Sequence, residues 1–350
     1  MFLDTAAYPT PAAMCADMQH ASTAAKTPEW ASGHVTLKPY APTPEITESI
    51  DALRTLHKKR QAGIRANTKL ALQAQAILRL QLHDEADYED EASKDAARKR
   101  TESLYKAVAK DPDHPLHPDI MFYLMAMAPL DEQRKLIEKE TARIAKTLPV
   151  FEWVKSVKGF GVNSFATIVG ECGDIGTYKS VSAVWKRLGL AVLGGNRQGS
   201  VCKGGMPDDS FSDDVLREIK SGKVSRESAS WIVHGYNPAR RSVSWNMRQN
   251  IIGGMGKFRP VYGEDVQANE ELTYYQRVYA ERLRYDSIKA PFTRKVASKF
   301  EPVLDDDGEP VTMRMSDKGK ESYSAHCANR AHRYVEKRLL KHLYLEWRRA

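Results

Sequence analysis

Apolar residues recur at helical spacing over much of the chain and predict helices separated by proline-rich or glycine-rich breaks. Residues 45–83 contain no proline and carry Ile46, Ile50 and Leu53 at intervals of three and four. A second helix is predicted to begin at Pro129-Leu130-Asp131, with Asp131 near its N-cap, and to run to Leu148. Nothing in residues 1–130 alternates between apolar and polar positions as a sheet would require. We therefore expect a mostly α fold.

The pattern divides the chain into three regions. Residues 1–44 are rich in Ala, Thr and Pro with little apolar periodicity, so we expect a mobile arm. Residues 45–150 are expected to form a long helical, coiled-coil-like region. Residues 151–350 are expected to form a helical domain containing a helix-hairpin-helix, with insertions near 206–228 and 286–320. The basic face of the long helix either lies along nucleic acid or is the solvated face of a coiled-coil arm.

The helix-hairpin-helix prediction rests on an apolar turn, a Gly-Phe-Gly hairpin and a following helix of small residues. Both glycines are expected to supply positive φ angles and close backbone approach. Amides at the start of the second helix, together with nearby lysines, would bind a phosphate oxygen. The candidate nucleic-acid-binding residues are Lys155, Lys158, Gly159, Phe160, Gly161 and Val162. The alternative is that this hairpin only connects two helices of an ordinary all-α core.

A second candidate site combines a glycine-rich loop with an arginine-rich helix. Five glycines fall within residues 194–205, and an Asn-Pro turn at Asn237 precedes a helix whose first turn is cationic. Arg240, Arg241 and Arg248 on this helix could bind phosphates bidentately. Trp245 is expected to be buried in the core rather than available for stacking.

Composition favours a polyanionic partner and gives no sign of a cofactor. The 350 residues carry a net charge of +8, with 53 Lys and Arg against 45 Asp and Glu, so basic patches must be local. Cys15, Cys172, Cys202 and Cys327 form no C-x-x-C pair, which argues against a disulfide framework or zinc site. Acidic runs at 84–91 and 305–307 are interpreted as solvated segments rather than metal sites. Without an apolar run long enough to span a membrane, or a secretory pattern, we expect a cytoplasmic protein that does not contact membranes.

The order of these motifs resembles the C-terminal domain of the Piv-type insertion-sequence transposases, also called the IS-one-ten or DEDD transposases. The similarity covers roughly residues 130–348. It comprises the hairpin KGFGVNSFATIVGECGDIGTYKS, the helix end at Gly189-Leu190, the Gly/Ser loop, the Asn-Pro-x-Arg helix and the basic closing helix at 328–344. That closing helix carries Val335, Leu339, Leu343 and Trp347 on one face.

The resemblance implies DNA recombination with a serine nucleophile. Ser200 best matches that serine, although its order with Gly199 is reversed, and Arg240 with Arg241 matches the arginine of the family's G-N-x-x-L-R segment. Members also use a structured RNA guide and a RuvC-like domain whose acidic residues bind divalent metal. Residues 1–130 show no such domain, so magnesium is expected only if a partner supplies that site.

Two hypotheses of function follow. The first is a DNA-binding, transposase-like protein that carries out serine-dependent recombination, with Ser200, Arg240 and Arg241 as catalytic residues. The second is a non-catalytic accessory or architectural protein of mobile-element origin that binds DNA or structured RNA. In the first hypothesis the long helix at 45–83 mediates dimerisation, and the protein is expected to be a homo-oligomer.

Overall fold

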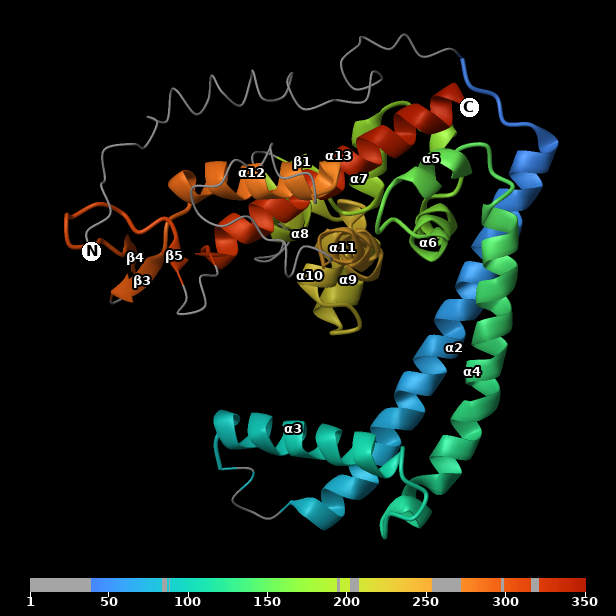
Figure 1. Ribbon diagram of the computed structural model, residues 1–350, viewed down its shortest axis with the longest axis vertical. Helices are drawn as coiled ribbons and strands as arrows, with labels where there is room; N and C mark the ends of the chain where they lie inside the picture. The colour runs from blue at the N-terminus through green and yellow to red at the C-terminus, as the bar shows by residue number, and fades with distance from the viewer. Residues whose placement is uncertain are drawn as a thin grey trace. The chain divides into compact units, whose positions relative to one another are not determined.

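The structure is a computed structural model that describes residues 39–83, 87, 89–193, 196–201, 208–253, 272–296, 299–315 and 321–350. Helices dominate these residues, which confirms the prediction of a mostly α fold (Figure 1). The chain divides into two compact units: residues 48–148, here called the helical unit, and the remainder, here called the C-terminal unit. This division lies within three residues of the boundaries expected at 45 and 150. Most of the expected mobile arm, residues 1–38, lies outside the described residues.

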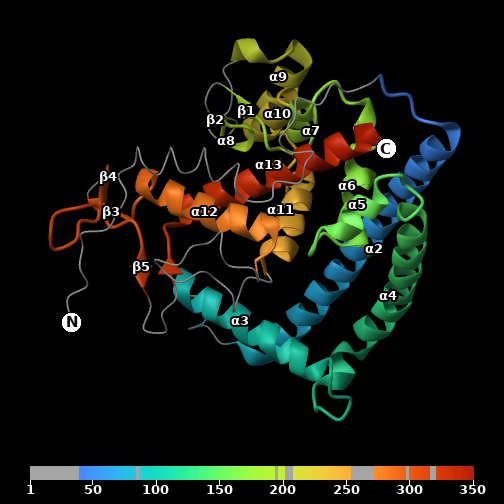
Figure 2. The same cartoon turned by 45° about the horizontal axis from the view of Figure 1, so that its top comes forward.

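The helical unit is built on an antiparallel pair of long helices, α2 (Pro44–Leu82) and α4 (His117–Ala145). Figures 1 and 2 both show the two helices side by side. Polar contacts mark the register: Arg60 Nε lies 2.8 Å from Glu138, and Asn67 and Gln81 donate to Asp131 and Asp119, each at 2.8 Å. Residue numbers rise on α2 as they fall on α4, as antiparallel packing requires.

The third helix of this unit, α3 (Glu91–Val108), closes a small apolar core at one end of the pair. Leu78, Val108 and Ile120, one from each helix, are all fully buried there. Asp90 caps α3 by accepting a 2.7 Å hydrogen bond from the amide of Ser93. One end of the predicted acidic run is therefore a helix cap, and residues 84–86 and 88 lie outside the described part of the chain.

Pro129 does not start a helix as predicted; it lies inside α4. Proline in a helix interior removes one backbone hydrogen bond and normally ends or kinks the helix. Here Asp131 and Glu138, both C-terminal to the proline, contact α2, so packing against the neighbouring helix holds α4 in place through the proline. Asp131 consequently accepts from Asn67 instead of capping a helix.

The C-terminal unit contains eleven helical segments among the described residues. They are α5 (Phe151–Ser156), α6 (Val162–Cys172), η3 (Ile175–Thr177), α7 (Val181–Arg187), α8 (Gln198–Val201), η4 (Asp208–Ser210), α9 (Asp213–Lys220), α10 (Arg226–Val233), α11 (Pro238–Gly253), α12 (Tyr274–Lys289) and, additionally, the long closing helix α13 (Ala325–Arg349). The expected peripheral insertion at 206–228 supplies η4, α9 and the start of α10, and residues 202–207 lie outside the described part.

Helix α13 is the centre of this unit. Its predicted apolar stripe is confirmed, since Val335, Leu339, Leu343 and Trp347 are each at most 1% exposed. Helix α12 lies alongside it, and α6, α7 and α11 pack around the pair (Figure 2). The Trp347 and Phe165 ring centroids are 6.0 Å apart, which joins the end of α13 to α6. The last helix in the unit therefore provides much of its core.

Strands are short and occur as separate antiparallel pairs in the described residues: β1 (Val192–Leu193) with β2 (Asn196–Arg197), β3 (Thr293–Val296) with β4 (Lys299–Pro302), and β5 (Arg314–Met315) with β6 (Glu321–Ser322). The last two pairs lie in the insertion expected at 286–320 and its flank. The acidic segment there is a turn, as predicted: Asp305 accepts hydrogen bonds from the amides of Asp307 and Glu309, and Gly308 has φ of 81°.

Residues 39–43 were expected to belong to the mobile arm, but Tyr40 fixes them on the C-terminal unit. The Tyr40 hydroxyl donates to Asp174 at 3.1 Å and accepts from the indole Nε1 of Trp347 at 3.0 Å. Its ring lies so close to Gly176 that a Cβ there would stand 2.4 Å from ring carbons. A side chain at position 176 would therefore displace Tyr40.

Candidate nucleic-acid interface

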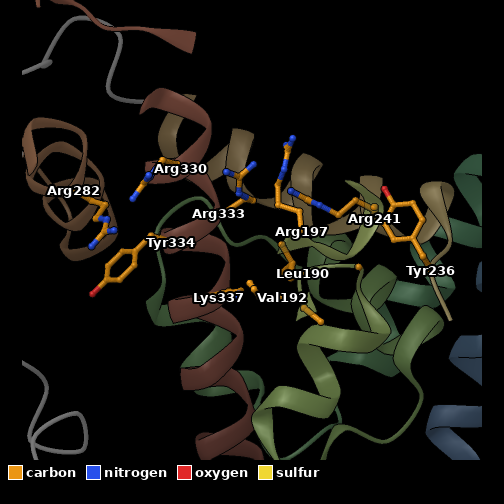
Figure 3. A pocket seen from close by; sticks show the side chains of 13 residues that line it. Leu190, Val192, Arg197, Tyr236, Arg241, Arg282, Arg330, Arg333, Tyr334 and Lys337 are labelled. Atoms are coloured by element: carbon orange, nitrogen blue, oxygen red, sulfur yellow. The ribbon is translucent and has the colours of Figure 1, made fainter. Parts of the chain in front are cut away.

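The C-terminal unit contains a cavity of about 420 Å³ in which cationic side chains converge from several elements. Figure 3 shows these side chains spread from α12 across α13 to β2 and α11. We call this cavity the arginine pocket. Its lining residues are Gly189, Leu190, Ala191, Val192, Arg197, Gly199, Tyr236, Arg241, Arg282, Arg330, Arg333, Tyr334 and Lys337.

Two glycines and a tyrosine shape one wall of the pocket. Gly189 ends α7 with φ of 70°, as the sequence predicted for that helix end. A Cβ on Gly189 would stand 2.9 Å from the Tyr236 ring, and one on Gly199 would stand 2.8 Å from it. Tyr236 therefore packs against the backbone at both positions. Because these glycines lack side chains, the ring can lie between the end of α7 and the loop that carries Gly199.

Gln198 holds that loop in place from inside the protein. Its side chain is fully buried, receives the amide of Ala191 at 3.3 Å, and donates to the carbonyl of His234 at 3.1 Å. The neighbouring residue Arg197, on β2, is exposed and lines the pocket. Because Gln198 points into the protein, the neighbouring Arg197 points the other way and lines the pocket.

Helix α13 supplies the opposite wall. Arg330, Arg333, Tyr334 and Lys337 follow one another at helical intervals and share one face of the helix. The apolar stripe through Val335 faces the core from the same helix. Lys337 also places its Nζ 5.0 Å from the centroid of the Trp185 ring, and burial lowers its pKa, helped by the charge on Arg333.

A fully buried carboxylate positions the α11 side of the pocket. Glu336 lies 2.8 Å from Arg241 and 2.9 Å from Arg248, and it accepts a 3.1 Å hydrogen bond from the Ser244 hydroxyl. Burial raises the pKa of Glu336, and the two guanidinium groups oppose that shift. One carboxylate is shared by two arginines, so positive charge remains in excess there.

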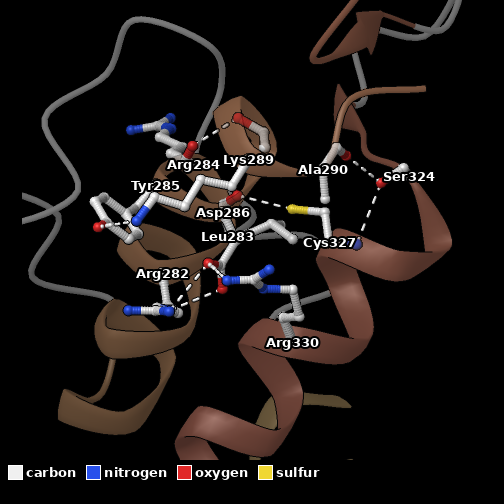
Figure 4. A network of polar contacts seen from close by, with 11 residues as sticks. Arg282, Leu283, Arg284, Tyr285, Asp286, Lys289, Ala290, Ser324, Cys327 and Arg330 are labelled. Carbon is white, nitrogen blue, oxygen red and sulfur yellow. Dashed lines mark hydrogen bonds and ion pairs between the residues drawn. The ribbon is translucent and has the colours of Figure 1, made fainter. Parts of the chain in front are cut away.

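A second buried carboxylate positions two arginines at the α12 end of the pocket. Asp286 is fully buried and lies 2.8 Å from Arg282 and 3.2 Å from Arg330 (Figure 4). Close by, Cys327 donates its thiol to the carbonyl of Leu283 at 3.1 Å, and burial raises its pKa to about 12. The thiol is therefore protonated and has a structural role.

Two pocket arginines have no acidic partner among the described residues. Arg333 and Arg197 form no ion pair there, and the pKa of Arg333 is lowered first by burial and then by the charges of Arg197 and Arg241. Burial contributes most to this shift, and the positive charges of Arg197 and Arg241 add to it, while Glu336 opposes it. The pocket has six cationic side chains and two neighbouring carboxylates, so it favours an anion.

The hairpin is formed as predicted at one glycine and differently at the other. Gly159 has φ of 86°, and a Cβ there would stand 2.8 Å from backbone atoms of Asn250 and Ile251 on α11. Gly161 is the N-cap of α6 with an ordinary φ of −69° and open space at its Cβ position. Only Gly159 therefore needs to be glycine, because only there do positive φ and close helix approach coincide.

The other hairpin candidates are split between surface and core. Lys155 and Lys158 are exposed, Val162 is partly exposed, and Phe160 is only 2% exposed, where it packs between Trp153 and Phe165. Lys158 borders a different cavity, of about 290 Å³, which Trp153 and Tyr274 also line. The hairpin residues do not line the arginine pocket.

The arginine-rich helix α11 starts as predicted, with the Asn237 side chain accepting the amide of Arg240 at 2.9 Å. The charge in its first turn is compensated within the protein: Arg240 pairs with Glu171 at 3.2 Å, and Arg241 pairs with Glu336. Arg241 lines the pocket, whereas Arg248 is only 4% exposed. In contrast to the prediction, Arg248 is thus a core residue.

The prediction that Trp245 is buried is wrong. Its side chain is 43% exposed, and the guanidinium of Arg248 lies 5.3 Å from its ring centroid. The helix turns Trp245 toward the solvent because Val243, Ser244 and Met247 occupy its buried face.

The predicted nucleophile, Ser200, directly follows a residue that lines the pocket. The backbone of Ser200 belongs to α8, directly after Gly199, while its side chain lies outside the described part of the structure. The structure therefore brings the Ser200 segment and Arg241 to the same cavity and places Arg240 against Glu171. Of the four cysteines, Cys172 and Cys327 are buried free thiols, and Cys15 and Cys202 lie outside the described residues.

Sequence reasoning missed most of the pocket. Arg330, Arg333 and Lys337 recur at intervals of three and four on α13, a signal visible in the sequence as a cationic face beside the apolar stripe. Arg197 lies within the glycine-rich loop at 194–205, where the sequence gives it no signal of its own. Arg282 carries no comparable local signal, because its place in the pocket depends on the pairing of α12 with α13.

Comparison with known proteins identifies no relative: no family, no curated protein and no solved structure matches the chain. In the described part of the chain, no group of three or more His, Cys, Asp or Glu residues is arranged to hold a metal ion. None of the described helices combines the length and apolar character needed to cross a membrane.

Proposed function

We propose that the C-terminal unit binds DNA by placing the phosphate backbone in the arginine pocket. The observation that carries this proposal is the convergence of six cationic side chains from β2, α11, α12 and α13 around two buried carboxylates. Guanidinium groups match phosphate oxygens bidentately, and they are the preferred cations for such recognition. A run of phosphates would supply the negative charge that this cavity lacks.

The resemblance to Piv-type transposases supports a serine-dependent reaction at the same place. In this proposal the Ser200 hydroxyl attacks a backbone phosphorus, an oxygen–phosphorus bond forms, and the bond to one strand's sugar oxygen breaks. The hydroxyl gives up its proton, and the departing sugar oxygen takes one up. Arg241 and Arg333 would stabilise the negative charge that develops on the phosphate.

Direct binding measurements test the first part. A fluorescein-labelled duplex of about 30 base pairs, a single strand and a structured RNA are titrated with the protein over a salt series. The slope of log affinity against log salt falls by about one unit for each phosphate contact removed. We expect this reduction for Arg333→Ala and Arg197→Ala, with duplex DNA bound best.

The matched control is Arg217→Ala on α9. This arginine is exposed and pairs locally with Asp214, so its loss should leave the slope unchanged. Equal slopes for the wild type, Arg333→Ala and Arg217→Ala would rule out the pocket as the phosphate site.

Cleavage is tested with Ser200→Ala. A serine nucleophile predicts a covalent protein–DNA adduct that survives denaturing electrophoresis and disappears in this variant, while DNA affinity is kept. Binding through the pocket without an adduct under any condition would instead favour the non-catalytic accessory protein.

A further inference from the structure

The β3–β4 hairpin is a ribbon that the rest of the described protein does not cover. All eight residues of its strands are exposed, and the hairpin follows the C-terminal end of α12 (Figures 1 and 2). An isolated two-stranded ribbon is marginally stable in water, since neither face buries apolar area. Phe300, at 72% exposed, and Val296, at 41%, are apolar residues left in solvent on this ribbon.

The register shows what the ribbon presents on each face. Lys295 pairs with Phe300, and Val296 pairs with Lys299. Residues directly opposite one another share a face, and neighbouring pairs lie on opposite faces. Each face of the outer half therefore carries one lysine and one apolar side chain. Neither Lys295 nor Lys299 forms an ion pair with another described residue.

Charge is separated along the ribbon. The lysines lie toward the end where residues 297 and 298 join the strands, whereas Arg294 stands opposite Glu301 nearer the base. The chain leaves the other end of β4 toward the acidic turn at Asp305. Lys299 and Asp305 are six positions apart along the chain, or roughly 20 Å at about 3.3 Å per residue of extended chain. A polyanion would thus be attracted to one end and repelled from the other.

The base of the ribbon is paired with the segment that follows it in the chain. The amide of Val303 donates to the carbonyl of Phe292 at 2.9 Å, and the amide of Phe292 donates to the carbonyl of Val311 at 2.8 Å. The guanidinium of Arg314 lies 4.3 Å from the centroid of the Phe292 ring. The ribbon is therefore a projection whose base is held by the following segment and whose outer half is cationic and partly apolar.

We propose that this ribbon enters the major groove of duplex DNA. The major groove of B-form DNA is wide enough for a two-stranded ribbon, and it offers guanine acceptors to lysine and thymine methyl groups to apolar side chains. The face carrying Lys295 and Phe300 has both kinds of group. This inference rests on the proposed DNA binding: the arginine pocket holds the backbone, and the ribbon reads base edges.

The test uses the full chain and the double variant Lys295→Thr/Lys299→Thr, in which threonine keeps the strand propensity and removes both charges. Labelled duplex DNA, single-stranded DNA and duplex RNA of one sequence are the probes. For duplex DNA we expect the salt slope to fall by about two units and the affinity at moderate salt to fall roughly tenfold. Duplex RNA affinity should hardly change, because the A-form major groove is too narrow for the ribbon.

Groove ligands locate the contact. Methyl green, which occupies the major groove, should compete with wild-type protein for duplex DNA, and netropsin, which occupies the minor groove, should compete less. The double variant should lose its sensitivity to methyl green. Phe300→Thr should weaken binding to duplexes containing thymine more than to the same duplexes with uracil, because uracil lacks the methyl group.

Two controls keep the outcome clear. Lys220→Ala/Lys223→Ala, at the end of α9 and in the turn after it, removes the same charge elsewhere and should leave the duplex affinity close to that of the wild type. Lys295→Arg/Lys299→Arg keeps the charge and should retain the wild-type slope. An unchanged slope in the threonine variant, or an equal loss with all three nucleic acids, overturns the inference.

The pocket variants separate this result from the proposed function. If Arg333→Ala reduces binding while the threonine variant does not, the pocket binds DNA and the ribbon does not enter the groove. If neither variant matters, both proposals fail. A change in the oligomeric state of the threonine variant without loss of DNA binding would mean that the ribbon pairs with a second copy of the chain, which also overturns the inference.

Discussion

The buried carboxylate of Glu336 lies 2.8 Å from the guanidinium of Arg241, and this ion pair joins α13 to α11 beneath the arginine pocket. Both oxygens are occupied, because Arg248 approaches the second one at 2.9 Å. Removing one partner from a buried ion pair leaves the other charge without compensation. Glu336 therefore holds the pocket's geometry and contributes to the stability of the unit.

We predict that Glu336→Gln lowers the free energy of unfolding by about 3 kcal/mol, because the buried Arg248 and the partly buried Arg241 lose their counter-charge. Urea unfolding followed by circular dichroism measures this change. Glu218→Gln, which breaks an exposed pair with Lys223, should cost less than about 1 kcal/mol. Equal costs for the two variants would show that Glu336 does not have this structural role.

The two hairpin glycines give a matched pair of variants. Gly159→Ala combines a positive φ with a Cβ placed 2.8 Å from the α11 backbone, so we predict a loss of about 2–4 kcal/mol. Gly161→Ala meets open space at an ordinary φ, and we expect a change within about 1 kcal/mol. Thermal unfolding of both proteins at one pH is the measurement. Similar values would contradict the close approach of the hairpin to α11.

His342 makes stability depend on pH. Its ring is buried beside Tyr275, with Nδ1 2.7 Å from the hydroxyl, and burial lowers the pKa of His342 from 6.5 to about 3. Between these values the unfolded chain binds a proton that the folded protein does not, so stability rises with pH over this window. It falls as the pH drops below about 6.5, by up to about 1.4 kcal/mol per pH unit.

The variant His342→Gln tests this assignment. Glutamine does not titrate, so the difference in unfolding free energy between the variant and the wild type should change steadily from pH 6.5 to pH 4. Unfolding by urea at closely spaced pH values measures the difference. A difference that stays constant over the window would mean that His342 is not the titrating group.

Tyr40 is predicted to anchor the segment before α2 through its hydroxyl. Burial raises the pKa of Tyr40 to about 12, so the hydroxyl stays protonated and can donate to Asp174 while accepting from Trp347. Tyr40→Phe should cost about 1–3 kcal/mol, because both partners lose a hydrogen bond in a partly buried site. Limited proteolysis near residue 40 should also become faster.

Tyr123→Phe is the control for this prediction, because its hydroxyl makes no hydrogen bond with a described residue. This substitution should change the unfolding free energy by less than about 0.5 kcal/mol, and it should leave the cleavage rate near residue 40 unchanged. Faster cleavage in this variant as well would remove the support for the Tyr40 anchor.

The sequence predicted the features that depend on neighbouring residues alone, such as the apolar face of a helix and the residue at which a helix begins. The apolar stripe through Val335 and Trp347 identified α13, and Asn237 with Pro238 identified the start of α11. Pro129 misled because tertiary contacts of α4 with α2 outweigh the local cost of an interior proline. Trp245 misled because the residue type says only that burial is common, not which face of a helix is buried.

The pocket could be predicted only in fragments. Arg333 belongs to a visible cationic face of one helix, but Arg197, Arg241 and Arg282 come from separate elements and meet only in the folded unit. Arginines at the start of α11 suggested an external anion, and two of them proved to face Glu171 and Glu336. Sequence alone shows the charges, whereas tertiary structure decides which of them remain without a partner.

The position of α13 also sets the order in which the protein can mature on the ribosome. This helix follows every other described element, yet it supplies the core partner of α6, α7, α11 and α12 and one wall of the pocket. At about 5–20 residues synthesised per second, the preceding helices wait several seconds for their central partner. The C-terminal unit therefore acquires its core and its cationic pocket in the same late step, because the pocket cannot form before α13 has been synthesised.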